Sequence, residues 1–95
     1  MADISVTDNR SLHRYEATVD GAVAGFAAYR LGSDTIVFTH TEVTPAFEDQ
    51  GIGSALARGA LDDVRRRGDR RVVALCPFIA AWIARHPGYQ DLLAA

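Results

Sequence analysis

The segment that decides the fold is Glu42–Leu56, with the sequence EVTPAFEDQGIGSAL. It joins an apolar, β-branched stretch ending at Val43 to an amphipathic pattern that begins after Gly51. The first N–H groups of a helix have no partner within the helix, and the helix dipole adds partial positive charge there. Glycines let a ligand approach the main chain closely. We therefore expect residues 49–54 to bind a phosphate or diphosphate group.

Two common phosphate-binding motifs do not fit this segment. A nucleotide-triphosphate loop needs a Lys and a Ser or Thr after its second glycine, but Ser54 and Ala55 follow Gly53 and the chain contains no Lys. A dinucleotide fingerprint needs a third small residue where Leu56 stands. A tight strand-to-helix turn without a ligand remains an alternative interpretation.

The segments before this loop predict an antiparallel meander. Residues 14–19 alternate between polar and apolar, and Asp20-Gly21 is a strong hairpin signal. We expect further strands over residues 22–30 and 35–43, the second rich in β-branched and aromatic residues. Residues 1–11 are mostly polar, which fits either an edge strand or a mobile arm.

The segments after the loop predict a helix, a strand and a second helix. The first helix runs over residues 51–67 and ends at Gly68, and residues 71–75 form a short apolar strand. Pro77 suits the start of a helix over residues 77–85. Because a strand–helix–strand crossover is right-handed, strands 35–43 and 71–75 are expected to be parallel. The predicted class is α/β, with a mixed, largely antiparallel sheet and packed helices in a single domain, residues 1–95.

Composition excludes several classes of function. The net charge is −2 and there is one cysteine, which rules out an internal disulfide. No apolar run approaches the ~20 residues of a membrane span, and the first residues do not resemble a signal peptide, so we expect a cytoplasmic protein without a membrane partner. The arginines at 65–67 and 70–71 follow Asp62 and Asp63, which indicates a solvated helix end and no nucleic-acid surface. His and Cys lack metal-ligand spacing, so no metal is expected.

The loop resembles the acetyl-coenzyme A loop of the GNAT superfamily of acetyltransferases. The resemblance extends to the strings HTEV at 40–43, CPF at 76–78 and HPGY at 86–89, which look like a subfamily of short, single-domain GNAT-like proteins. It covers roughly residues 13–93. The superfamily usually has Gln or Arg three residues before the first glycine, where this chain has Glu48. The diphosphate would therefore rest mainly on main-chain donors.

The resemblance also implies how acetyl-coenzyme A would lie. Strands 35–43 and 71–75 would splay apart, and the pantetheine arm would slot between them. The strand edge at Val43 and Thr44 would align the pantetheine. The diphosphate would be held by Asp49, Gln50, Gly51, Ile52, Gly53 and Ser54.

Three candidate catalytic residues are predicted to converge. The carboxyl ends of parallel neighbours lie at one sheet edge, so His40 and Glu42 are expected near Cys76. A cysteine at a helix N-terminus is a candidate acyl-accepting nucleophile, with His40 accepting its proton. The alternatives are that Cys76 is a small buried apolar side chain and that His40 is a hydrogen-bonded core residue.

Glu42 and Tyr89 are the other candidates. Glu42 shares strand parity with His40 and is a candidate base for the incoming amine, or a partner that rigidifies the loop. The resemblance implies that Tyr89 protonates the leaving coenzyme A thiolate. The alternative for Tyr89 is packing of the C-terminal segment.

Two functions follow from these expectations. The first is an acetyl-coenzyme A-dependent transfer to an amine acceptor, small or protein-borne, either by direct attack or through Cys76. The second is a module that binds acetyl-coenzyme A or coenzyme A without efficient transfer. Larger GNAT enzymes place helices between their first strands, whereas Asp20-Gly21 joins these strands directly, which favours an open acceptor side.

Overall fold

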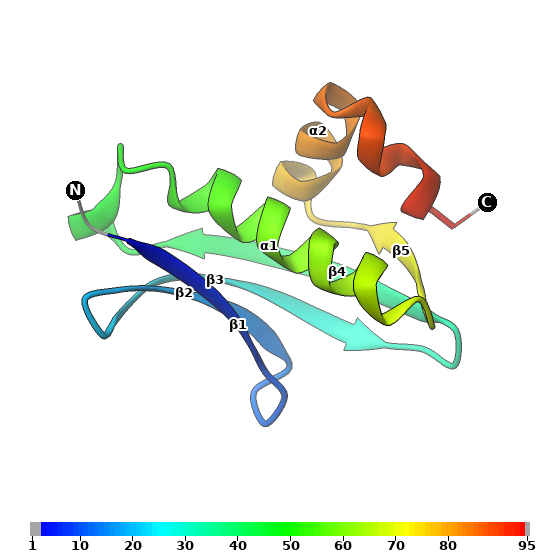
Figure 1. Cartoon of the computed structure of the whole chain (residues 1–95), viewed down its shortest axis with the longest axis horizontal. Coiled ribbons are helices and arrows are strands. Elements are labelled where there is room, and N and C mark those ends of the chain that lie inside the picture. The colour runs from blue at the N-terminus through cyan, green and yellow to red at the C-terminus, as the bar shows by residue number, and fades with distance from the viewer. Residues whose placement is uncertain (1–2, 95) are drawn as a thin grey trace.

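The computed structural model describes residues 3–94, which form one sheet and two packed helices. The strands follow the order β1-β2-β3-β4-β5 in the sheet (Figure 1). Neighbours are antiparallel as far as β4, and β4 and β5 are parallel. The predicted fold class is confirmed. The elements are β1 (Ile4–Asn9), β2 (Arg14–Val19), β3 (Ala22–Leu31), β4 (Thr35–Val43), η1 (Pro45–Phe47), α1 (Ile52–Arg67), β5 (Arg71–Ala74), α2 (Pro77–Arg85) and η2 (Pro87–Leu92).

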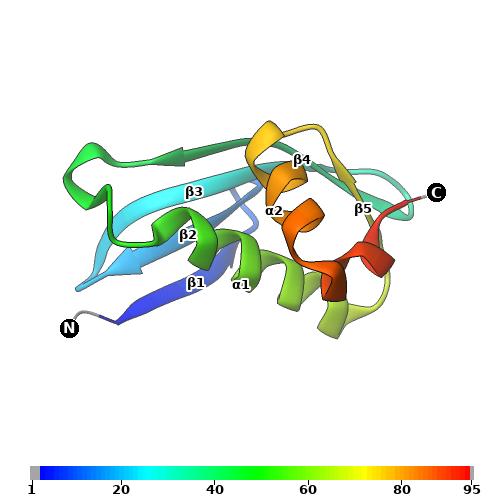
Figure 2. The ribbon, with the colours of Figure 1, turned by 90° about the horizontal axis from the view of Figure 1, so that it is seen from above.

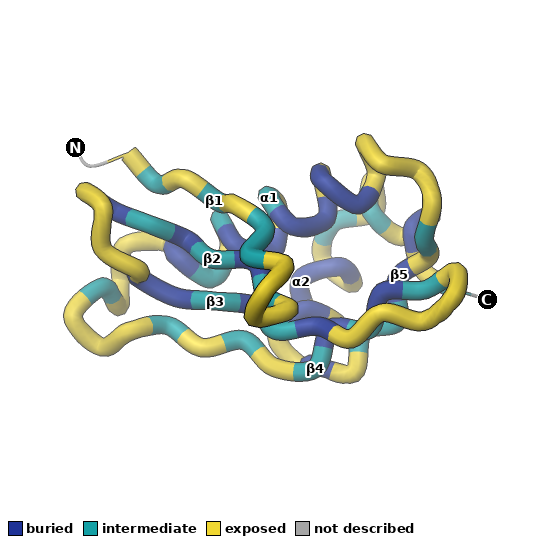
Figure 3. The backbone as a smooth tube through the Cα atoms, turned by 90° about the horizontal axis from the view of Figure 1, so that it is seen from below, coloured by how far each residue is buried: buried dark blue, intermediate teal, exposed yellow. Residues whose placement is uncertain are grey.

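Both helices pack against the same face of the sheet (Figures 1 and 2). Alternate residues of β2 are therefore buried, as the dark blue segments of Figure 3 show. The core lies between this face and the apolar side of α1, where Phe38, Leu56 and Leu61 are fully buried. Neither helix within residues 3–94 combines the length and apolar character that a membrane crossing requires.

β5 runs beside only the first half of β4. The pairing begins at Thr35 with Arg71 and ends at Phe38 with Ala74. The N–H groups of Leu75 and Cys76 then both donate to the carbonyl oxygen of Phe38, at 3.0 and 2.9 Å. The chain leaves the sheet there and enters α2. Among residues 3–94, no strand pairs with segment 39–43 on that side, so β4 and β5 diverge.

An extra residue interrupts the pleat of β4. Ala28 pairs with His40 while Tyr29 pairs with Phe38, which leaves Thr39 as a β-bulge. Before the bulge, Phe38 points into the core with no exposed surface. After it, the side chain of His40 is 60% exposed on the uncovered face of the sheet. The bulge therefore exchanges the two faces for the remainder of the strand.

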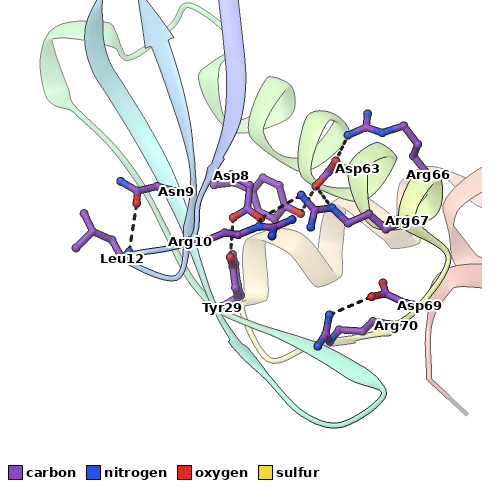
Figure 4. A network of polar contacts seen from close by, with 11 residues as sticks. Asp8, Asn9, Arg10, Leu12, Tyr29, Asp63, Arg66, Arg67, Asp69 and Arg70 are labelled. Atoms are coloured by element: carbon purple, nitrogen blue, oxygen red, sulfur yellow. Dashed lines mark hydrogen bonds and ion pairs between the residues drawn. The ribbon is translucent and has the colours of Figure 1, made fainter.

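A buried carboxylate ties α1 to the sheet. The Asp63 side chain is 11% exposed and accepts hydrogen bonds from the Tyr15 hydroxyl at 2.7 Å and from Arg67 Nε at 2.9 Å. Arg66 pairs with the same carboxylate (Figure 4). Asp63 and Arg67 pair at i,i+4 spacing, so this helix end is not simply solvated, which corrects the expectation from the sequence. Arg67 belongs to a part-buried network, because the Tyr15 hydroxyl on β2 bonds the same Asp63 carboxylate and so holds the sheet against this end of α1.

A second carboxylate extends this network to β1 and β3. The Tyr29 hydroxyl donates to Asp8 Oδ1 at 2.6 Å, and Asp8 Oδ2 lies 3.5 Å from Arg67 Nη2 (Figure 4). Burial, followed by this hydrogen bond, raises the pKa of Tyr29 to about 12. Burial also raises the pKa of Tyr15, with Asp63 as the next cause. Both phenols are therefore held in the neutral form.

We predict that replacing Asp63 with Asn destabilises the fold far more than the same change at its neighbour Asp62. Asp63→Asn removes the anion that Tyr15 and Arg67 share in a buried position, so the free energy of unfolding should fall by about 3 kcal/mol. Asp62 lies on the solvent side of α1, and Asp62→Asn should cost less than about 1 kcal/mol. Urea unfolding followed by circular dichroism measures both. Equal losses of unfolding free energy in the two variants would contradict the structural role given to Asp63.

We further predict a loss of stability in alkali. An unfolded tyrosine ionises near pH 10, whereas folded Tyr29 keeps its proton to about pH 12. The stabilisation is therefore complete below pH 10 and is lost as the pH rises towards 12. Urea midpoints measured across this range should fall, and Tyr29→Phe should show a shallower fall than the unaltered protein. An identical slope in the two proteins would show that Tyr29 is not the titrating group.

Candidate active site

The predicted phosphate-binding loop borders a groove of about 400 Å³ at the end of the sheet where α1 begins. Val43 at the end of β4 and Phe78 in the first turn of α2 form its apolar walls. Its other lining residues are Phe47, Glu48, Asp49, Gly51, Ile52, Gly53 and Ser54. Of the residues predicted to bind the cofactor, only Thr44 and Gln50 do not line it. The Thr44 N–H donates to Ala24 O at 2.8 Å, so it is committed to β3.

The first turn of α1 presents main-chain donors to this groove. Gly51 occupies the N-cap position in the left-handed region, with φ of 77°, and provides no side chain to cap the helix. The first intrahelical bond runs from Ala55 N–H to Gly51 O at 3.0 Å, so the N–H groups of residues 52–54 precede it. This arrangement fits a diphosphate, because these donors and the helix dipole both favour an anion.

The missing side chain of Gly53 lets the Phe78 ring form one wall of the groove. A Cβ atom at this position would lie 2.7 Å from Phe78 Cζ, which is closer than real Cβ atoms approach. The aromatic ring therefore rests directly on the main chain of the first helical turn. Phe78 is 42% exposed. It is a groove residue that sequence reasoning missed.

Cys76 lies where β5 ends and α2 begins. It is the N-cap residue of α2, and its side chain is buried, with the residue 3% exposed. Its Sγ atom lies 3.3 Å from Thr41 Oγ1, across the gap that opens between β4 and β5. The end of β5 therefore meets β4 near its middle and not at its carboxyl end. The β4 residue that meets Cys76 is Thr41, which the sequence did not single out.

His40 and Glu42 lie together on the opposite, uncovered face of the sheet. His40 Nε2 is 3.3 Å from Glu42 Oε1, and both side chains are more than half exposed. The Phe26 ring of β3 packs edge-on against His40 on this face, with the ring centroids 6.0 Å apart. The expectation that His40 and Glu42 share a face is met. The structure does not bring His40 to Cys76, because the bulge at Thr39 turns it away.

Tyr89 lies in η2 and makes its polar contacts with α1. Its hydroxyl donates to Asp62 Oδ1 at 2.7 Å and accepts from Arg58 Nη1 at 3.3 Å. The hydrogen bond to Asp62 is the main cause of a raised pKa of Tyr89. Its ring packs edge-on against Trp82, with centroids 4.9 Å apart. These contacts fit the alternative of C-terminal packing and do not join Tyr89 to His40, Glu42 or Cys76.

A larger hollow, of about 460 Å³, lies at the other end of the sheet, around the C-terminal end of α1. Asp8, Arg10 and Arg67 line it, and the two arginines lie 3.5 Å from the carboxylate of Asp8. Arg70 lines it as well and is bonded to Asp69 at 3.3 Å. Its charged groups therefore largely neutralise one another, whereas the groove at α1 has main-chain donors that precede the first helical bond.

Comparison with known proteins assigns the chain to a family of enzymes. The sequence matches the family described as GCN5-related N-acetyl-transferase over residues 14–92. The chain therefore belongs to the GNAT family of N-acetyltransferases, whose members typically use acetyl-coenzyme A and an acceptor substrate. A comparison with curated proteins gave no match.

The fold is also similar to that of a solved acetyltransferase. The crystal structure of ribosomal-protein-alanine N-acetyltransferase from Brucella melitensis biovar Abortus 2308 superposes with a TM-score of 0.62 at 18% sequence identity. The match covers 100% of this chain and 92% of that chain. At this identity the likeness concerns the fold.

Proposed function

We propose that this chain transfers the acetyl group of acetyl-coenzyme A to an amine. The observation that carries the proposal is the groove in which the donors of residues 52–54 lie beside the unpaired edge of β4, in a chain of the GNAT family. The diphosphate would bind the N–H groups of the first turn of α1. The groove residues Glu48 and Asp49 are acidic, so main-chain donors carry this contact.

The pantetheine arm would extend along the edge of β4 over residues 39–43. An extended chain can pair with an unpaired strand edge through main-chain hydrogen bonds, as in β-augmentation. The apolar side chains of Val43 and Phe78 would flank the arm where it leaves the groove. Its thioester end would then lie near Thr41 and Cys76, whose side chains contact each other at 3.3 Å.

We favour direct attack by the acceptor. The amine nitrogen forms a bond to the acetyl carbon, the bond from carbon to sulfur breaks, and coenzyme A leaves as a thiolate that takes a proton from water. The proton lost by the amine goes to His40 or Glu42, which are exposed to solvent beside this edge. The route through a Cys76 thioester is less favoured, because Cys76 is buried and is not paired with His40. Positioning would supply most of the rate enhancement.

A second candidate function is binding of acetyl-coenzyme A or coenzyme A without efficient transfer. The observation in its favour is that Asp20 and Gly21 alone connect β2 to β3. No helix within residues 3–94 therefore covers the face on which His40 and Glu42 lie. An acceptor on this open face would be a protein N-terminus, a polyamine or another amine that brings its own contacts.

Coenzyme binding is tested by titrating the single tryptophan, Trp82, with acetyl-coenzyme A and by native mass spectrometry of the mixture. We expect a saturable fluorescence change and a one-to-one adduct. Gly53→Val should weaken binding about tenfold, because the new side chain displaces the Phe78 ring from the groove wall. Gly88→Ala is the matched control, since open space surrounds that position. An absence of both signals in the unaltered protein would rule out both candidate functions.

The catalytic step is tested by an acceptor screen with detection of released thiol, covering amines, polyamines and protein N-termini. With the best acceptor, His40→Gln should lower kcat by about a hundredfold and leave the affinity for acetyl-coenzyme A unchanged. Cys76→Ala should retain most of the activity. A trapped acetyl group on Cys76 in peptide maps, together with an inactive Cys76→Ala variant, would establish the covalent route instead.

A further inference from the structure

Arg58 differs from the other arginines of α1 in its partners. Arg65 pairs with Asp91 at 2.9 Å and Arg67 with Asp63 at 2.9 Å. Within residues 3–94, Arg58 forms no ion pair, and its hydrogen bond goes to the neutral hydroxyl of Tyr89. The Tyr89 hydroxyl itself donates to Asp62, so a phenol separates that carboxylate from the guanidinium. Arg58 is exposed and its charge is not neutralised by a direct carboxylate contact.

Arg58 lies one helical turn from the groove, on the same side of α1 as Ser54. Residues four apart on a helix are neighbours, and their side chains lean towards the N-terminus, which here is the groove end. The indole Nε1 of Trp82 donates to Ser54 Oγ at 3.3 Å. The Arg58 guanidinium lies 5.4 Å from the centre of the Trp82 ring. Ser54 and Arg58 are exposed, and Trp82, at 5% exposure, supports both from below. Ser54 and Arg58 thus form a strip of surface that leads out of the groove, where α2 lies beside α1 (Figure 2).

Charge distinguishes this surface from the opposite wall of the groove. The loop before α1 carries Glu48 and Asp49, both of which line the groove. No arginine lines it, and the chain has no lysine. A phosphate group that emerges from the groove therefore meets two carboxylates in one direction and the Arg58 guanidinium in the other. An anion is favoured on the Arg58 side.

We propose that Arg58 is the specificity-determining cation for the 3′-phosphate of coenzyme A. This inference rests on the proposed function, in which the groove holds the diphosphate. The ribose of coenzyme A connects the diphosphate to the 3′-phosphate, so the adenosine lies across the surface formed by Ser54 and Arg58. The doubly charged phosphate displaces the Tyr89 hydroxyl as the partner of the guanidinium. Arg58 thereby distinguishes coenzyme A from carriers that end at the diphosphate.

The test compares coenzyme A with 3′-dephospho-coenzyme A, neither of which can acetylate the protein, by isothermal titration calorimetry on the full chain. The unaltered protein should bind coenzyme A about fivefold more tightly, the factor expected for one exposed charge pair. Arg58→Gln should reduce this ratio to less than about twofold, and Arg58→Lys should keep part of it. Arg65→Gln is the matched control, because it removes the same charge further along α1 and should keep the ratio.

The outcomes separate this inference from the proposed function. If neither compound binds, the proposed function fails. If both bind with equal affinity to the unaltered protein, the groove binds the diphosphate but the role of Arg58 is overturned. A ratio lost equally in Arg65→Gln would also overturn it, since the effect would then come from the overall field of the helix. The contact between Arg58 and the 3′-phosphate is supported if Arg58→Gln alone abolishes the affinity ratio of the two compounds. The ratio in the unaltered protein should also decline as salt is added.

Discussion

The carbonyl oxygen of Phe38 is the point on which the architecture depends. It accepts hydrogen bonds from two successive N–H groups, those of Leu75 and Cys76, which ends the parallel ladder in the middle of β4. The chain then turns into α2, whose first residue is Pro77, a residue without an N–H group to continue the ladder. In the described part of the chain, one edge of β4 is left without a partner strand over residues 39–43. The groove, the position of Cys76 and the proposed path of the coenzyme all follow from this early end of β5.

The β-bulge at Thr39 then places the candidate site residues on opposite faces of the sheet. The covered face receives Thr41 beside Cys76 and leads into the groove, while the uncovered face receives His40 and Glu42. A donor and an acceptor can therefore approach the same short strand segment from different sides. In the proposed reaction, this separation would let a small sheet with helices on only one face receive two substrates. It also makes main-chain geometry, rather than the spacing of catalytic side chains, the main determinant of the site.

Local sequence signals sufficed for the elements and for the groove. The alternation in 14–19, the Asp20-Gly21 turn and the glycines around α1 each act over a few residues, and their consequences could be predicted. The bulge could not, because an extra residue in a strand needs no particular residue type, and Thr39 continues an ordinary β-branched run. The sheet-edge argument that placed His40 near Cys76 therefore failed, because the bulge sends the His40 side chain to the other face. The structural role of Arg67 was equally hidden, since it depends on Asp8 and two tyrosines that only the folded sheet brings to α1.

An unpaired strand edge is where sheets from separate molecules tend to join and aggregate. In β4 this edge is short, carries the ionisable His40 and the charged Glu42, and is followed by Pro45, which has no N–H group to offer a neighbouring chain. Natural sheets use these same features to discourage intermolecular pairing. The opening required for a slender ligand is thus compatible with a molecule that resists fibril-like stacking along this part of β4.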